Sequence, residues 1–265
     1  SEFAATPERV ERLKREAKAA SGLNHPNICT LYDIGNVGES YYLVMEYMEG
    51  QSLAQRVKKG PMPLPEVLRV GIDIAAALDC SHRAGVIHRD LKPANVMLTK
   101  TGAKLLDFGV AQLRAPSAEP GLSGVRTETA TLSEVGQVVG TPAYMAPEQL
   151  EGRPVDARTD IYGFGATLFE AASGRRLYEG PSKMSVIASV LQGDTPSLSS
   201  VRHGVSPSID RVVRKSLARD PDDRWQTARD LGDELRWLES QSNPDLAVVR
   251  SATAFSRSIL AREVL

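Results

Sequence analysis

The residues of this chain that could do chemistry are concentrated in the string 88–95, which reads HRDLKPAN, and in a second acidic residue at Asp107. Transfer of a phosphoryl group needs a carboxylate that accepts a hydroxyl proton, a cation that steadies the moving group, and oxygen ligands for a metal ion. Asp90, Lys92 and the pair Asn95 and Asp107 could meet these needs in that order. Oxygen ligands favour a hard cation such as Mg²⁺, and these groups would make a poor zinc site.

Helices and short strands must position this string. A long helix is expected before it, because apolar residues recur at helical spacing until Gly85, namely Val67, Val70, Ile74 and Ala77, with Ser81 continuing the same face. Between Val86 and Phe108 the helical period vanishes. Two small strands are predicted there, at 96–99 and 104–106, with a turn at Thr101-Gly102.

Other elements follow from capping and turn residues. A first helix is predicted from Thr6 to Gly22, then a hairpin of strands at 28–34 and 41–47. Ser52 and Gln55 form a capping box for a short helix. Later helices should begin at Asp156 and end at Gly174, begin at Ser206-Pro207, and begin at Thr227. Residues 114–140 are polar and aperiodic, which predicts a long loop.

Composition limits the class of protein. The 265 residues carry a net charge of −1 with 42% hydrophobic residues, so no overall field attracts nucleic acid and a real core can form. Cys29 and Cys80 are too few for a disulfide framework and lack metal-ligand spacing. No run of about 18 apolar residues could span a bilayer. We therefore expect these 265 residues to be soluble and cytoplasmic, with no membrane segment among them. A membrane segment outside them stays open.

Over residues 1–240 the chain resembles the catalytic domain of bacterial eukaryotic-like serine/threonine protein kinases. The resemblance rests on the string 88–95, on Asp107-Phe108-Gly109 and on Ala146-Pro147-Glu148, in the family's order and spacing. It implies an α+β, two-lobed protein-kinase-like fold, with a partial small lobe at 1–48, a mostly helical lobe at 49–240 and a polar tail at 241–265. It also implies transfer of the ATP γ-phosphoryl group to proteins, with ATP and Mg²⁺ as cofactors.

Two strings resemble those of serine/threonine kinases and imply serine or threonine hydroxyls of proteins as acceptors, while no nucleic-acid partner is expected. Lys92 stands two residues after Asp90, and 140–145 reads GTPAYM, like the substrate-docking segment of serine/threonine kinases. By resemblance, Thr141 would hydrogen-bond both Asp90 and Lys92. The backbones of Glu46 and Met48 would bind adenine beside the gatekeeper Met45, and Met97 would pack under the ring.

The resemblance also assigns supporting roles. His88 and Phe108 would stack with Leu31 in an apolar spine, Asp160 would accept backbone N–H bonds from the catalytic loop, and Glu148 and Arg224 would form a buried ion pair. Arg89 would pair with a phosphate on the long loop, for which the candidate acceptors are Thr127, Thr129, Thr131 and Ser133. Glu16 would pair with the lysine that anchors ATP.

Two family features do not appear before the first predicted helix: a Gly-rich phosphate-covering loop and the lysine strand that would pair with Glu16. We therefore expect the chain alone to be inactive and to bind nucleotide weakly. Because all four catalytic side chains are intact, a piece of an active kinase is favoured over the alternative, a pseudokinase-like protein-interaction module. The sequence upstream of Ser1 would discriminate between them. The polar tail resembles a juxtamembrane linker, so the chain could be the cytoplasmic part of a membrane-anchored protein.

Overall fold

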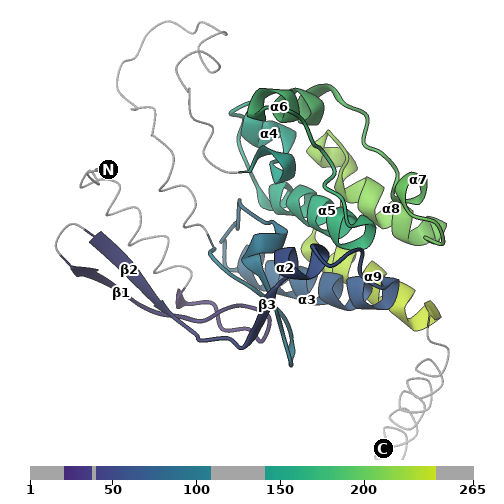
Figure 1. The fold of residues 1–265 in the computed structure, drawn as a ribbon. Coiled ribbons are helices and arrows are strands. Elements are labelled where there is room, and N and C mark those ends of the chain that lie inside the picture. Colours follow the sequence, from purple (N-terminus) through teal and green to yellow (C-terminus); the bar gives the residue numbers. More distant parts are fainter. Residues whose placement is uncertain (1–20, 38–39, 109–140, 243–265) are drawn as a thin grey trace, which may run out of the picture.

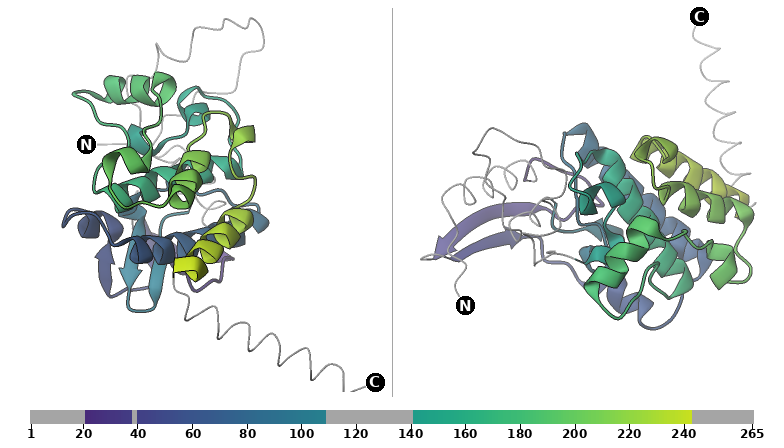
Figure 2. Two further views of the ribbon diagram at one scale, coloured as in Figure 1. Left: turned by 90° about the vertical axis from the view of Figure 1, so that its right-hand side faces the viewer. Right: turned by 90° about the horizontal axis from the view of Figure 1, so that it is seen from above.

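A β-hairpin lies beside a larger body of helices in the computed structural model of the chain (Figure 1). The structure describes residues 21–37, 40–108 and 141–242. The first predicted helix therefore falls almost wholly outside the described residues. The right-hand view of Figure 2 shows the hairpin projecting from one side of the helical body.

The hairpin consists of β1 (Leu31–Val37) and β2 (Ser40–Met45), which pair antiparallel with Leu31 opposite Met45. The first strand begins three residues later than the sequence predicted. Ile28 instead forms an isolated parallel bridge with Leu105 and is only 2% exposed. Its side chain belongs to the core of the helical body. The apolar run that begins at residue 28 is therefore divided between that core and strand β1.

A three-stranded antiparallel sheet lies between the hairpin and the helices. Its order is β3 (Gly50–Ser52), β4 (Val96–Thr99) and β5 (Gly102–Leu105). The strands β4 and β5 and their turn were predicted, but β3 was missed because three residues are too few to show a period of two. Gly102 has a φ of 127°, and a Cβ there would lie 2.8 Å from the Asp73 carboxylate. Glycine is required at this turn for both reasons.

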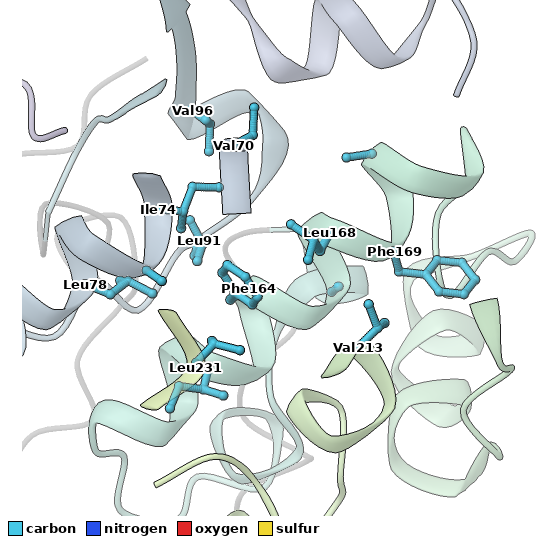
Figure 3. Packing of buried hydrophobic residues seen from close by; sticks show 14 of the residues in the cluster. Val70, Ile74, Leu78, Leu91, Val96, Phe164, Leu168, Phe169, Val213 and Leu231 are labelled. Atoms are coloured by element: carbon cyan, nitrogen blue, oxygen red, sulfur yellow. The ribbon is translucent and has the colours of Figure 1, made fainter. Parts of the chain in front are cut away.

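The helical body is built around α5 (Ala157–Ser173), which is buried along most of its length. On one side it contacts α3 (Leu64–Arg83), which in turn packs along α9 (Ala228–Ser242), and on the other it contacts α8 (Pro207–Ser216). In Figure 3, Phe164 of α5 is seen between Leu91, which belongs to the string 88–95, and Leu231 of α9. Because Leu91 is buried in this cluster, the string 88–95 lies directly on the core.

Capping residues set the helix ends as the sequence predicted. Ser52 and Gln55 cap α2 (Leu53–Val57), Asp156 accepts the Arg158 N–H at the start of α5, and Gly174, with φ 71°, ends α5. The sequence analysis missed α6 (Lys183–Gln192) and α7 (Leu198–Val201), although Ser182 and Ser197 cap them. The remaining short elements are η1 (Pro93–Asn95), η3 (Pro142–Tyr144), α4 (Pro147–Leu150) and η4 (Pro221–Asp223).

Candidate active site

Three side chains of the string 88–95 form one hydrogen-bonded group between α3 and β4. Lys92 Nζ lies 2.5 Å from Asp90 Oδ2. The Asn95 side-chain amide donates to the Asp90 backbone carbonyl at 2.8 Å and to Asp90 Oδ2 at 3.2 Å. The turn η1 brings Asn95 back toward Asp90, since the Asn95 N–H donates to the Lys92 carbonyl. The Asp90 carboxylate is therefore held in one orientation by a cation and an amide.

Asp160, in the first turn of α5, holds the backbone of this loop. Its carboxylate accepts the His88 N–H at 2.8 Å and the Arg89 N–H at 2.7 Å, and it is 1% exposed. His82 Nε2 on α3 also contacts Asp160 Oδ2, at 2.7 Å. The sequence analysis missed His82, whose only signal was its place in the last turn of the helix before the string.

Two non-glycine residues beside the site have left-handed backbones: Arg89, with φ 66°, and Asp107, with φ 54°. Such conformations cost roughly 1–3 kcal/mol and persist only where the surroundings impose them. At Arg89 the surroundings include Asp160 on the N–H and the Gln149 side-chain amide, which donates to the Arg89 carbonyl at 2.9 Å. Strain of this kind is characteristic of functional loops.

His88 connects the loop to the strand that leads to Asp107. Its Nδ1 accepts the Asp90 N–H at 3.3 Å, which leaves Nε2 to donate to the Leu106 carbonyl at 2.8 Å. The ring is fully buried and lies 4.8 Å from the Phe108 ring, at an interplanar angle of 57°. The Leu106 N–H donates to the Asn95 carbonyl at 2.9 Å. Asp107 therefore directly follows a residue, Leu106, whose backbone is hydrogen-bonded to Asn95.

Asn95 and Asp107 have side chains that suit a hard divalent cation. The Asn95 amide nitrogen is directed at Asp90, so its side-chain oxygen points away from Asp90 and can act as a ligand. Asp107 is exposed and supplies a carboxylate. An oxygen-only donor set with few protein ligands fits an ion that keeps several waters or phosphate oxygens.

The predicted hinge follows β2. Glu46 is held by Lys104 of β5, whose Nζ lies 2.6 and 2.9 Å from the two carboxylate oxygens. The hydrogen bond from Lys104 is the main cause that holds the pKa of Glu46 below its ordinary value. The other residues predicted for the adenine site are partly accessible: Met48 and Met97 are half-buried and Met45 is 38% exposed. Leu31, predicted for the apolar spine, packs against the core.

A cavity of about 270 Å³ lies next to Lys92 and is lined in part by Thr141, Tyr144, Glu170 and Arg176. The Tyr144 hydroxyl donates to Glu170. Burial raises the pKa of Tyr144, and this hydrogen bond raises it further.

Within the described part of the chain, no hydrogen bond joins Thr141 to Asp90 or Lys92, so that expected contact stays a prediction.

Glu148 and Arg224 form a bidentate ion pair inside the helical body. The guanidinium nitrogens lie 2.7 and 2.8 Å from the two carboxylate oxygens, and the residues are 2% and 1% exposed. Thr159 Oγ1 also donates to Glu148 at 2.8 Å. Burial alone would raise the pKa of Glu148, but the hydrogen bonds and charge of Arg224 hold it below its ordinary value. The pair ties α4 to the segment before α9.

Several predicted residues lie outside the described ranges and carry no structural statement. They are Glu16, Gly109, Thr127, Thr129, Thr131 and Ser133.

The fold and the site together define a class. Residues 3–234 match the protein kinase domain family, and the chain belongs to that family. The expected α+β, two-lobed kinase fold is confirmed, since the kinase domain of PknI from Mycobacterium tuberculosis superimposes with a TM-score of 0.67 at 28% identity, covering 88% of this chain and 79% of that one. Membership of this family implies ATP and a divalent metal ion as cofactors.

Its relatives include bacterial serine/threonine kinases. The chain is 37% identical over 251 residues to the serine/threonine-protein kinase PknB of Mycobacterium leprae, covering 92% of this chain and 38% of that protein. It is 39% identical over 245 residues to a probable serine/threonine-protein kinase of Streptomyces coelicolor, covering 89% of this chain and 34% of that protein. The chain thus spans less than two fifths of the length of these curated relatives. Among the described helices, none has the length and apolar character needed to cross a bilayer.

Proposed function

We propose that this chain is the catalytic part of a serine/threonine protein kinase that transfers the γ-phosphoryl group of ATP to protein hydroxyls. The observation that carries the proposal is the Asp90 carboxylate, held by Lys92 at 2.5 Å and by the Asn95 amide at 3.2 Å. A carboxylate fixed in this way is prepared to accept the proton of an acceptor hydroxyl as that oxygen attacks.

The other catalytic side chains divide the remaining work. Lys92, which pairs with Asp90, would steady the transferred phosphoryl group. Asn95 and Asp107 would hold Mg²⁺, which supplies charge neutralisation at the phosphates when it is bound. The backbones of Glu46 and Met48 would bind adenine above Met97, and Glu16 would pair with a lysine that anchors ATP.

Supporting residues would hold the catalytic loop in place and regulate the activity. His88, Phe108, Asp160 and the pair Glu148 and Arg224 would fix the loop and the substrate-docking segment that contains Thr141. Arg89 would pair with phosphate on Thr127, Thr129, Thr131 or Ser133. The partners would be proteins with serine or threonine acceptors. The chain would act in the cytoplasm. Relatives named as serine/threonine kinases support this choice of acceptor.

The test is Asp90→Asn in the whole protein, with phosphotransfer to a serine- and threonine-containing protein as the assay. Loss of the proton acceptor should lower kcat by about 10²–10⁴-fold and leave KM for ATP within about twofold. Asp107→Asn should instead weaken Mg²⁺-dependent nucleotide binding. The matched control is Asp233→Asn, the same chemical change on the exposed face of α9, which should alter neither value.

Equal losses of nucleotide affinity in the two site variants would contradict the division of roles. A wild-type protein that binds partners without any phosphotransfer would favour the alternative, a pseudokinase-like interaction module.

A further inference from the structure

The Glu46–Lys104 ion pair joins the predicted hinge to a strand that lies far from it in the sequence. Glu46 follows β2, and Lys104 is in β5. Both carboxylate oxygens receive the ammonium group, at 2.6 and 2.9 Å, and the side chains are only 25% and 16% exposed. A partly buried, charge-assisted contact of this kind is stronger than an exposed surface pair.

Lys104 lies on the sheet that would carry the adenine ring. It is the cross-strand partner of Met97 in β4, and directly opposed residues of antiparallel strands present their side chains on the same face. Met97 is the residue expected under the ring. The ion pair therefore links the hinge to the same face of the sheet on which the base would rest.

The backbone around Glu46 is fixed at the same point. The Glu46 N–H donates to the Thr30 carbonyl at 2.9 Å, and the Thr30 N–H donates to Glu46 Oε2 at 3.2 Å. The Cys29 N–H in turn donates to the Leu105 carbonyl at 2.8 Å. Through these bonds the hinge, the segment before β1 and β5 form one junction, in which Lys104 supplies the positive charge.

We propose that Lys104 is a positioning residue for nucleotide binding, which fixes the hinge backbone and keeps the Glu46 carboxylate away from the base. The inference rests on the proposed function, since it takes the hinge to be the adenine site. Without the ammonium group, the partly buried Glu46 carboxylate would keep only the hydrogen bond from the Thr30 N–H and would turn toward water. The backbone groups of Glu46 and Met48 would then lose their fixed position.

The test measures adenosine binding by calorimetry in the whole protein, because adenosine contains no phosphate and needs no metal ion. Lys104→Met should weaken adenosine binding by about five- to tenfold, the scale of one partly exposed charged hydrogen bond. KM for ATP should rise by the same factor, while kcat stays within about twofold because Asp90 and Lys92 are untouched. A residue that only stabilised the fold would not separate KM from kcat in this way.

The chain offers a matched control in Lys100, which pairs with Glu49 at 3.7 Å with both side chains exposed. Lys100→Met should leave adenosine binding unchanged. Glu46→Gln should weaken binding as Lys104→Met does, and the double variant should be no worse than either single one. Binding within about twofold of wild type in Lys104→Met, or losses that add in the double variant, would overturn the proposal.

A conservative variant keeps the test decisive if Lys104→Met folds poorly. Lys104→Arg retains a cation that can pair with Glu46, and it should bind adenosine within about threefold of wild type. A loss as large as that expected for Lys104→Met, in a folded protein, would also refute the proposal. Phosphotransfer is not the primary readout. A wild-type protein that binds adenosine without transferring phosphate would therefore count against the proposed function and leave the adenosine comparison intact.

Discussion

The helical body and the β1–β2 hairpin differ in how much of their apolar surface is covered. In α5, Ile161 and Phe164 are fully buried, whereas Tyr32 and Tyr42 of the hairpin are 64% and 50% exposed. The residues proposed for proton transfer rest on the buried body, whereas Glu46 and Met48, proposed to bind adenine, directly follow the hairpin. Stability and catalytic geometry should therefore depend on the first region, and nucleotide affinity on the few bonds that hold the second.

The strongest test of the first half of this comparison is Arg224→Met. Removal of one partner from a buried ion pair leaves an uncompensated charge and typically costs about 3–5 kcal/mol. We expect a loss of that size in the free energy of unfolding, measured by chemical denaturation. Arg153→Met, which breaks an exposed pair with Glu151, should cost no more than about 1 kcal/mol.

The dependence on pH provides a further check of the same pair. The pKa of Glu148 in the folded protein lies below its ordinary value of 4.5. The stabilisation is therefore complete above the unfolded-state pKa and is lost as the pH falls through the folded-state pKa. The stability difference between wild type and Arg224→Met should shrink as the pH falls through the folded-state pKa of Glu148. A difference that is the same at every pH down to acid unfolding would show that the ion pair is not its source.

A smaller effect is expected for Asp160→Asn. The amide has one acceptor oxygen in place of two, and its NH₂ group would face a backbone N–H of the loop. We expect a loss of about 1.5–3 kcal/mol in unfolding free energy, the usual value of hydrogen bonds to a charged group. Amide hydrogen exchange at His88 and Arg89 should accelerate, and kcat should fall. Asp230→Asn, on the exposed side of α9, is the control and should leave exchange at the loop unchanged.

The smallest effect belongs to the hairpin. Tyr32→Ser should change the unfolding free energy by no more than about 0.5 kcal/mol, because an exposed side chain loses little packing. The same substitution at Tyr162 of α5, 1% exposed, should cost about 3–5 kcal/mol. A loss above about 2 kcal/mol at Tyr32 would mean that this face is covered in the protein, and the two regions would then not differ as described.

The sequence predicted well those features that depend on local signals. Capping residues such as Ser52, Asp156 and Ser206 determine helix starts through bonds to the next turn, so their positions could be read directly. The Asp90, Lys92 and Asn95 group is likewise local, because all three side chains lie within six residues.

Contacts between distant segments could not be predicted in this way. Nothing local indicates that Ile28 pairs with Leu105, that His82 contacts Asp160, or that Lys104 binds Glu46. Each of these contacts depends on how separate elements pack. Resemblance to a family suggested the Glu148–Arg224 pair, whereas periodicity and spacing gave no sign of it.

The hydrogen bonds that Asp160 accepts also have a consequence for the order in which the protein can fold during synthesis. His88 and Asp160 are 72 residues apart, and Glu148 and Arg224 are 76 apart. A ribosome-bound chain that has not yet reached Asp160 already contains every catalytic side chain described here, but not the carboxylate that fixes their loop. Contacts of such long sequence separation form late, since loop closure must be completed first. The catalytic geometry can therefore be acquired only after α5 has been synthesised and has docked against α3.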